Sequence, residues 1–281
     1  MPIQKFIKLT KNRTREIKMK KIFVTVVIPV KNGEKTIART LNSALRQDYK
    51  NFEVIVVDDC SNDNTIKILK SYGNKIKLIK NKKNLGPAAS RNKGIKKARG
   101  EIIFFTDSDC FVPINWISKI LKEYKNEKIA GVGGYLKPWK NNWVAFLEHL
   151  QNKFILGIKN KKIINGLRTP MGYTNNASYR KKVLEEVNGF DEKFPQPAGE
   201  DIDLKRKICE KGYLVVYAPF PVVHLDTYDL DYLVNRIITR GLDKKPPNNK
   251  IFKFIYAIIT LPISFFRVIA KIIKYKFKNL I

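Results

Sequence analysis

The stretch IIFFTDSD, residues 102–109, is an apolar run that ends in two carboxylates separated by one serine. Its β-branched and aromatic side chains follow the break at Gly100, which predicts a buried central strand rather than a helix. Asp107 and Asp109 then lie at the strand's C-terminal end, where open α/β sheets bind ligands. Two neighbouring carboxylates repel each other unless a cation or water intervenes. The pair is therefore either a Mg²⁺ or Mn²⁺ site or a solvated acidic turn.

The residues upstream of this stretch alternate between strand and helix patterns. Such alternation predicts an α/β fold, with a doubly wound, mostly parallel sheet flanked by helices. A second acid pair, Asp58 and Asp59, ends another buried run, so both pairs are expected at one edge of the sheet. The predicted strands are Phe23–Val30, Phe52–Asp58 and Ile76–Ile79, and the predicted helices are Glu34–Gln47, a segment carrying Ile66 and Leu69, and Gly86–Ala98.

Downstream, the pattern predicts further helices and strands and two more candidate groups. Glu200 and Asp201 occupy the first turn of a helix that runs to Lys211. The helix dipole favours acids there, so a structural role remains open beside a chemical one. His224 follows the last predicted strand and is either a packed side chain or a ligand. The other predicted elements are helices Trp116–Tyr124 and Lys181–Val187 and strands Ile129–Gly133, Asn175–Arg180 and Val215–Tyr217.

Composition limits the class of protein. With 281 residues and 44% hydrophobic content, the chain can form one large or two small globular domains. Its three cysteines have no C-x-x-C spacing and no histidine near by, so neither a disulfide framework nor a zinc site is predicted, and a reducing compartment fits. No apolar signal-peptide core precedes Phe23, so secretion is not expected.

The net charge of +30 is concentrated toward the two ends of the chain. Residues 1–21 hold eight basic side chains and one acid, and residues 244–281 hold nine basic side chains and no acid. A protein that binds nucleic acid in a groove would instead interleave its basic side chains with aromatics along a central face. We therefore expect no nucleic-acid partner and favour an anionic membrane surface.

The C-terminal segment, residues 246–281, begins with the linker PPNN and contains an uncharged run of thirteen residues, Phe254–Phe266. A bilayer-spanning helix needs about 20 apolar residues, so this run is short for a span. Basic residues flank it, which favours an interfacial helix whose lysines contact lipid headgroups. The alternative is a helix that packs on the globular domain.

Six blocks of the sequence, in this order and spacing, resemble family 2 glycosyltransferases over about residues 22–226. The resemblance implies a GT-A fold, a nucleotide-diphosphate-sugar donor, a Mn²⁺ or Mg²⁺ cofactor and inverting transfer to a glycan or lipid-linked acceptor in surface glycan synthesis. No Q-x-x-R-W block follows Asp201, which argues against a processive synthase. The blocks are VVIPVKNGE (26–34), VIVVDDCSNDNT (54–65), GPAASRNKGI (86–95), FTDSD (105–109), NGFDEKF (188–194) and GEDIDL (199–204).

The resemblance also implies a role for each matching residue. The general base is Asp201, with Glu200 beside it in the acceptor site. The metal ligands are Asp109 and Asp107, with His224 completing the shell. The residues implied in nucleotide-sugar binding are Pro29, Lys31, Asp58, Asp59, Arg91 and Asp107.

This interpretation predicts a basic tail (1–21), a catalytic domain (22–245) and a membrane-associated segment (246–281), with the protein at the cytoplasmic face of the cell membrane. Two alternatives stay open. One is a sugar-nucleotide pyrophosphorylase, which would carry a glycine-rich phosphate loop after the first strand; residues 29–34 match that poorly. The other is a non-enzymatic polyanion-binding protein, whose affinity would depend steeply on salt.

Overall fold

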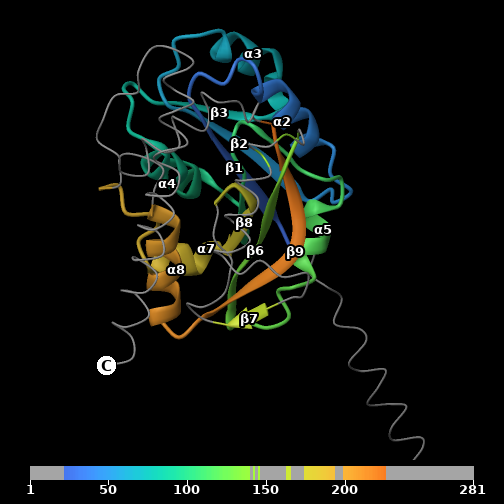
Figure 1. Ribbon diagram of the computed structural model, residues 1–281. Coiled ribbons are helices and arrows are strands. Elements are labelled where there is room, and N and C mark those ends of the chain that lie inside the picture. The colour runs from blue at the N-terminus through green and yellow to red at the C-terminus, as the bar shows by residue number, and fades with distance from the viewer. Residues whose placement is uncertain are drawn as a thin grey trace, which may run out of the picture.

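The computed structural model describes residues 22–139, 142, 145, 163–165, 174–193 and 199–225. They form one sheet with helices on both faces (Figure 1). The strands lie in the order β3-β2-β1-β4-β8-β6-β9-β5, with β7 paired to β9. Their bounds are β1 Val24–Val30, β2 Phe52–Asp58, β3 Lys77–Lys80, β4 Ile102–Phe105, β5 Cys110–Phe111, β6 Ile129–Pro138, β7 Ile163–Asn165, β8 Ala177–Arg180 and β9 Leu214–His224.

The helices that pack on this sheet are short. Two of them, α4 and α8, carry residues of the predicted site. The α-helices are α2 Ile37–Leu45, α3 Thr65–Ser71, α4 Pro87–Lys97, α5 Trp116–Leu121, α7 Lys181–Glu186 and α8 Glu200–Glu210, and single 3₁₀ turns cover Gly73–Lys75 and Thr174–Asn176.

The N-terminal half of the sheet is parallel, as the alternating pattern predicts. β1 pairs in parallel with β2 on one side and with β4 on the other, and β2 pairs in parallel with β3. Val30 lies opposite Asp58, and Val27 lies opposite Phe105. The carboxyl ends of β2 and β4, which carry the two acid pairs, therefore meet at the same edge of the sheet.

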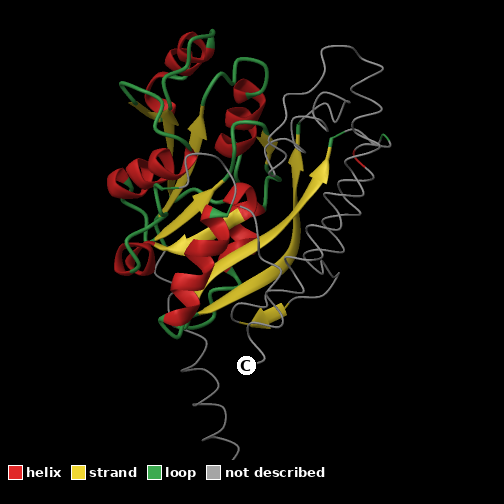
Figure 2. Cartoon of the chain, turned by 60° about the vertical axis from the view of Figure 1, so that its left-hand side comes forward, coloured by secondary structure: helices red, strands yellow, loops and turns green. Residues whose placement is uncertain are grey.

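The C-terminal half is mixed rather than parallel. β8 is antiparallel to both β4 and β6, whereas β6 and β9 are parallel to each other. The short strands β5 and β7 pair antiparallel with β9. Figure 2 shows the long strands β6 and β9 side by side. The predicted α/β class is confirmed, and the parallel arrangement holds for the first four strands.

The largest differences between expected and observed elements concern length. The strand expected over 129–133 continues to Pro138, and the strand expected over 215–217 is β9, which runs from Leu214 to His224. Because β6 and β9 pair over most of their length, each supports residues that have little strand pattern of their own. His224 thus lies at the end of a strand and not in the loop after it.

Two apolar cores lie on opposite faces of the sheet. On one face α2, α3 and α5 cover the even-numbered residues of β1, and the Trp116 ring meets the Phe104 ring edge-on at 5.0 Å. On the other face α4, α7 and α8 cover Val27 and Phe105, and Phe105 meets Phe190 edge-on at 5.4 Å (Figure 1). Buried on both faces, the central strands are near-continuous apolar runs, as β4 is in the sequence.

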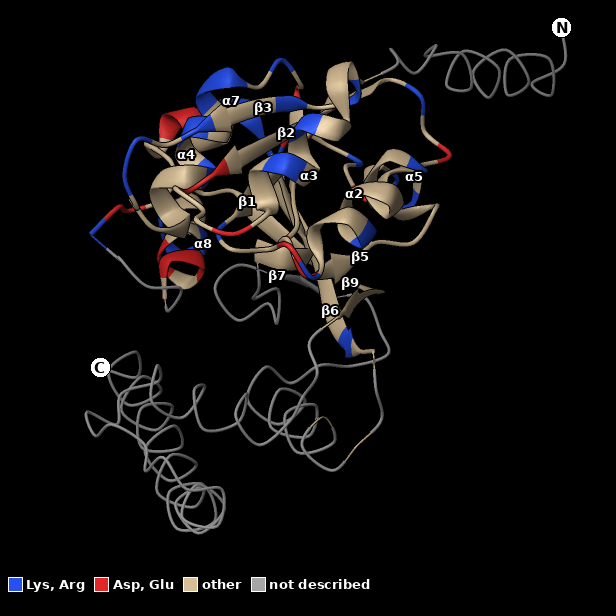
Figure 3. Ribbon diagram, turned by 90° about the horizontal axis from the view of Figure 1, so that it is seen from above, with Lys and Arg blue, Asp and Glu red and all other residues tan. Residues whose placement is uncertain are grey.

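The basic side chains of the described residues are spread over several elements. Figure 3 shows lysines and arginines on α3, α4, α5 and α7 rather than gathered in one groove. No helix among the described residues is long and apolar enough to cross a bilayer. The predicted basic tail, 1–21, and the predicted membrane-associated segment, 246–281, lie outside the described residues.

The approach of α4 to β1 is set by Gly94. A Cβ atom built on this glycine would lie 3.1 Å from Val27 Cγ2 and closer still to Val27 Cγ1. Val27 is fully buried and cannot move aside freely. Gly94 therefore holds α4, and with it Arg91, close against the sheet.

We expect Gly94→Ala to lower the free energy of unfolding by about 1–3 kcal/mol, because overpacking outweighs the gain in helix propensity. Denaturant unfolding measures the change, and Lys97→Ala, at an exposed position of the same helix, is the control. The double variant Gly94→Ala/Val27→Ala should lose less free energy of unfolding than the sum of the losses of the two single variants, because the smaller Val27→Ala side chain makes room for the new Cβ. Additive losses would show that the strain lies elsewhere.

Candidate active site

A buried arginine joins the D-x-D turn to the start of α8. Arg91 Nη2 donates to Asp107 Oδ1 at 2.9 Å, and Arg91 Nη1 donates to Glu200 Oε1 at 2.9 Å. The arginine side chain is 3% exposed. Burial alone would lower the arginine pKa, but the two carboxylates outweigh it and raise the pKa above its ordinary value. The guanidinium is therefore a fixed positive charge at the sheet edge.

Two of the three predicted metal ligands, Asp109 and His224, lie side by side. Asp109 Oδ2 lies 3.3 Å from His224 Nε2, because β5 pairs with β9 and the Leu225 amide donates to the Asp109 carbonyl at 2.7 Å. Asp107, also predicted as a ligand, is bonded to Arg91 instead. Burial opposes ionisation of Asp109, but the hydrogen bond and charge of His224 lower its pKa. Asp109 is thus held ionised beside an imidazole.

Cys110 is a third member of this group that sequence reasoning missed. Its thiol Sγ lies 3.6 Å from Asp109 Oδ1, and the oxygen, sulfur and nitrogen donors of Asp109, Cys110 and His224 all lie within 4.8 Å of one another. The sequence offered only a cysteine directly after D-x-D. The β5–β9 pairing that places it opposite His224 has no local signal, since β5 is two residues long.

The two acids that end β2 have different surroundings. Asp59 accepts hydrogen bonds from Asn81 Nδ2 (2.7 Å) and from the amides of Leu85 (2.9 Å) and Gly86 (2.8 Å). Both of its oxygens are thereby engaged by the loop that precedes α4. Asp58 is also buried, but its Oδ1 has no partner among the described residues, and Oδ2 accepts one bond, from the Ser61 amide at 3.3 Å. Asp58 thus has an acceptor left for a ligand.

The loops after β1 and β2 hold each other in place. The Asn32 amide donates to Ser61 Oγ at 2.9 Å, and the Asn62 amide donates back to Asn32 Oδ1 at 3.0 Å. Asn32 adopts a positive φ of 52°, a conformation that asparagine tolerates better than most residues. Pro29 lies within β1 opposite Val57, and Lys31 is exposed at the start of the turn. Both predicted residues are therefore chain neighbours of Val30, which pairs with Asp58 at this edge of the sheet.

The D-x-D turn is fixed from the opposite side of the sheet as well. Thr40, fully buried on α2, donates through Oγ1 to the Ser108 carbonyl at 2.8 Å. Together with the Arg91–Asp107 bond, this contact holds the turn between α2 and α4. The spacing of the two aspartates therefore sends their side chains to different partners, Arg91 and His224.

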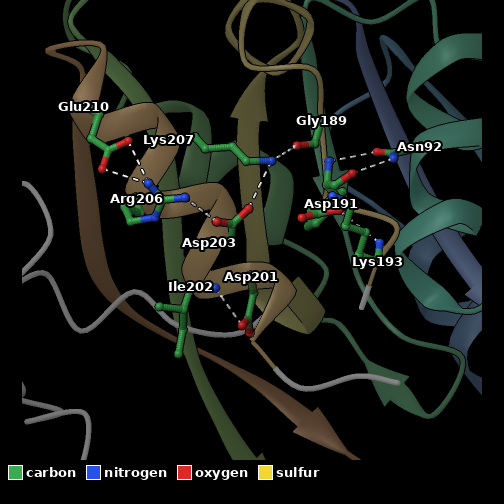
Figure 4. A network of polar contacts seen from close by, with 11 residues as sticks. Asn92, Gly189, Asp191, Lys193, Asp201, Ile202, Asp203, Arg206, Lys207 and Glu210 are labelled. Atoms are coloured by element: carbon green, nitrogen blue, oxygen red, sulfur yellow. Dashed lines mark hydrogen bonds and ion pairs between the residues drawn. The ribbon is translucent and has the colours of Figure 1, made fainter. Parts of the chain in front are cut away.

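Asp201 lies at the start of α8 beside the buried Glu200. Burial raises the pKa of Asp201 to about 7, and the neighbouring charge of Glu200 adds to the rise. Its Oδ1 accepts a hydrogen bond from the Ile202 amide at 2.8 Å (Figure 4). Figure 4 also shows its carboxylate turned away from the cluster that Asp203, Arg206 and Lys207 form along the helix. A carboxyl that titrates near neutral pH can accept a proton from a weak acid.

The loop before α8 is anchored to α4 by Asn92. Its Oδ1 accepts from the Phe190 amide at 2.9 Å, and its Nδ2 donates to the Phe190 carbonyl at 2.8 Å (network in Figure 4). Gly189 leaves room for this side chain, since a Cβ there would lie 2.5 Å from Asn92 Oδ1. Consecutive residues of α4, Arg91 and Asn92, thus fix the two segments that carry Glu200 and Phe190.

Comparison with known proteins gives consistent matches. A family model described as Glycosyl transferase family 2 matches residues 25–187. The chain is 30% identical over 179 residues to the Escherichia coli protein named UDP-Glc:alpha-D-GlcNAc-diphosphoundecaprenol beta-1,3-glucosyltransferase WfgD, covering 59% of this chain and 71% of that protein. It is 42% identical over 93 residues to poly(ribitol-phosphate) beta-N-acetylglucosaminyltransferase TarS of Staphylococcus aureus, covering 31% of this chain and 16% of TarS. This chain thus spans only a small part of TarS.

Solved structures share the fold. Mannosyltransferase PcManGT from Pyrobaculum calidifontis, in complex with GDP-Man and Mn²⁺, superposes with a TM-score of 0.62 at 20% identity over 90% of this chain and 74% of that one. S. aureus TarS 1–349 in complex with UDP-GlcNAc gives a TM-score of 0.55 at 22% identity over 80% of this chain and 68% of that one. The GT-A fold expected from the sequence is confirmed.

The Arg91 network gives a test of stability. Arg91→Gln should lower the free energy of unfolding by about 3–5 kcal/mol, because Asp107 and Glu200 lose the charge that compensates them. Arg99→Gln is the matched control: Arg99 pairs with Glu53 at 3.0 Å but is 71% exposed, so its loss should cost at most about 1 kcal/mol. Urea unfolding of both variants measures the two losses in the free energy of unfolding. Equal losses would show that the buried ion pairs of Arg91 contribute no more to stability than the exposed pair of Arg99.

Proposed function

Because the chain belongs to glycosyl transferase family 2, we propose that it is an inverting, metal-dependent, non-processive enzyme that moves a sugar from a nucleoside-diphosphate donor to an acceptor hydroxyl. One observation carries the proposal. A carboxyl that titrates near neutral pH, Asp201, lies next to Glu200, and Arg91 ties Glu200 directly to the D-x-D turn. The Arg91 side chain thereby links the segment that carries the proposed proton acceptor, Asp201, to the D-x-D turn, where the anionic diphosphate would bind.

The donor nucleotide occupies the edge formed by the ends of β1 and β2. Asp58 Oδ1, buried and without a partner among the described residues, accepts a base N–H. Uracil and guanine both present such a donor, in keeping with the UDP-GlcNAc and GDP-Man complexes of the similar structures. Pro29 and Lys31 line the same edge. Asp59 supports it indirectly, by holding the loop before α4.

The residues present fit a hard or borderline divalent cation. Asp109 and His224 would hold it, with a carboxylate oxygen that suits Mg²⁺ or Mn²⁺ and an imidazole that suits Mn²⁺ better. When bound, such a cation neutralises the charge that develops on the departing diphosphate. Asp107 orients the turn through Arg91, and its side chain, which is 30% exposed, would be available to the donor's ribose.

The acceptor hydroxyl is deprotonated by Asp201. As the bond between the sugar and the diphosphate breaks, the hydroxyl oxygen attacks the anomeric carbon from the opposite face, so the configuration inverts. The proton of the hydroxyl passes to the Asp201 carboxylate. Glu200 cannot substitute readily, because its Oε1 is bonded to Arg91 and its side chain is 4% exposed. Glu200 instead positions Asp201.

The acceptor is a glycan or a lipid-linked sugar at the cytoplasmic face of the cell membrane, within surface glycan synthesis. Support comes from WfgD, whose name specifies a diphosphoundecaprenol acceptor. It also comes from the uncharged run 254–266 with its basic flanks. Peripheral attachment through this segment brings the domain to a lipid-borne substrate.

Asp201→Asn tests the proposed base. The variant should bind nucleotide sugar in the presence of Mn²⁺ but lose about 10²- to 10⁴-fold in transfer rate, since only the proton acceptor is removed. Asp109→Asn is the contrasting variant and should lose Mn²⁺-dependent donor binding itself. Calorimetry with UDP- and GDP-sugars and a transfer assay give the two readouts. Transfer by Asp201→Asn within a few-fold of wild type would mean that Asp201 is not the base.

The raised pKa of Asp201 sets two pH dependences. Wild-type transfer should rise as pH passes through about 7, because the base must be ionised. The carboxyl stabilises the fold most below its unfolded value of 3.8, and this contribution is lost as pH rises through about 7. Asp201→Asn should therefore be more stable than wild type above pH 7 and lose that advantage toward pH 4.

Removing Phe252–Ile281 tests the membrane attachment. The full chain should sediment with anionic liposomes, because each basic residue near the surface contributes about 1 kcal/mol and the apolar run adds a term that salt does not screen. The truncated protein should remain in solution and still bind donor nucleotide. If the full chain does not sediment, or if truncation unfolds the domain, the segment packs on the protein instead.

A further inference from the structure

The proposed function gives no role to Cys110, although this side chain completes a group of three donors. Cys110 is fully buried and lies in β5 opposite His224 of β9. Its Sγ is 3.6 Å from one carboxylate oxygen of Asp109, and His224 Nε2 is 3.3 Å from the other. Oxygen, sulfur and nitrogen donors thus face one another within 4.8 Å.

These separations resemble those of a zinc site. Donors that bind tetrahedral Zn²⁺ at their usual bond lengths lie about 3.3–3.7 Å from one another. Both carboxylate separations fall in this range, each to a different oxygen of Asp109: the imidazole lies 3.3 Å from Oδ2 and the thiol 3.6 Å from Oδ1. Three protein donors leave a fourth position open, which is the pattern of zinc sites that bind an exogenous group rather than of closed structural sites.

We propose that Asp109, Cys110 and His224 form a site for a thiophilic divalent cation of the zinc class, with the Cys110 thiolate as the soft ligand. Thiolate and imidazole ligands select Zn²⁺ over Mg²⁺, which prefers six oxygens. On binding, the Cys110 thiol and the His224 Nε2–H that faces Asp109 would each lose a proton to solvent, and metal–sulfur and metal–nitrogen bonds would replace their contacts with Asp109. With Asp109 ionised, the resulting centre would be neutral.

The zinc-class cation and the proposed catalytic cation exclude each other. Both need the Asp109 carboxylate and the His224 imidazole, so Zn²⁺ displaces Mg²⁺ or Mn²⁺ from the donor site. The inference shares these two residues with the proposed function. Its measurement requires neither a sugar donor nor transfer, so the failure of one proposal is distinguishable from the failure of the other.

Cobalt spectroscopy on the full chain tests the ligand directly. Co²⁺ stands in for Zn²⁺ and gives a near-ultraviolet charge-transfer band when a thiolate binds it. The chain has three cysteines, so the double variant Cys60→Ser/Cys209→Ser leaves Cys110 as its only thiol without altering the site. We expect this variant to show the band and stoichiometric Zn²⁺ to abolish it. Absence of the band in this variant overturns the proposal.

Calorimetry of Cys110→Ser separates ligation from packing. Zn²⁺ affinity should fall by at least about tenfold, since even partners outside the ligand shell are worth roughly 10- to 100-fold. Mg²⁺ affinity should change by no more than a few-fold, because Asp109 and His224 remain. A parallel loss of both affinities would mean that Cys110 only packs against the site, and the proposal would be wrong. Cys209→Ser, at a half-buried cysteine of α8, should leave both affinities unchanged.

Discussion

The Arg91 guanidinium, held between Asp107 and Glu200, is the interaction on which the geometry of the site depends. A buried charge is tolerated only when partners compensate it, and each of these carboxylates comes from a different part of the chain. Gly94 sets how closely α4 packs on β1, and Asn92 fixes the adjacent loop. The position of the start of α8 is therefore determined by α4 from two consecutive residues.

This arrangement also separates the chemistry of two neighbouring acids. Glu200 compensates the arginine and has little freedom to accept a proton. Asp201 lies half-buried beside it, and desolvation and the charge of Glu200 raise its pKa to about 7. The same division occurs at the end of β2. Asp59 accepts hydrogen bonds from the segment before α4, whereas Asp58 keeps one oxygen without a partner among the described residues. In each pair one acid provides structure and the other is available for chemistry.

The sequence predicts the features that depend on local patterns and misses those that depend on long-range pairing. The apolar runs and the acids that end them identify β1, β2 and β4 and their common edge. The family blocks single out Asp109 and Asp201 as candidates, and the wider resemblance, to about residue 226, adds His224. The sequence does not distinguish the roles of the adjacent residues Asp58 and Asp59, because these roles depend on which of the two accepts hydrogen bonds from residues 81–86. Cys110 is missed because β5 is recognisable only through its partner β9.

The contact between Arg91 and Glu200 spans 109 residues of sequence, whereas the parallel strands β1 to β4 are joined by short crossovers. Loop-closure entropy favours the formation of near contacts first, and synthesis also delivers the N-terminal residues first. The edge formed by β1 and β2 can therefore form on a nascent chain before the start of α8 has docked on Arg91. Under the proposed function, a chain at that stage would carry the Asp58 edge but not yet the proposed base, Asp201.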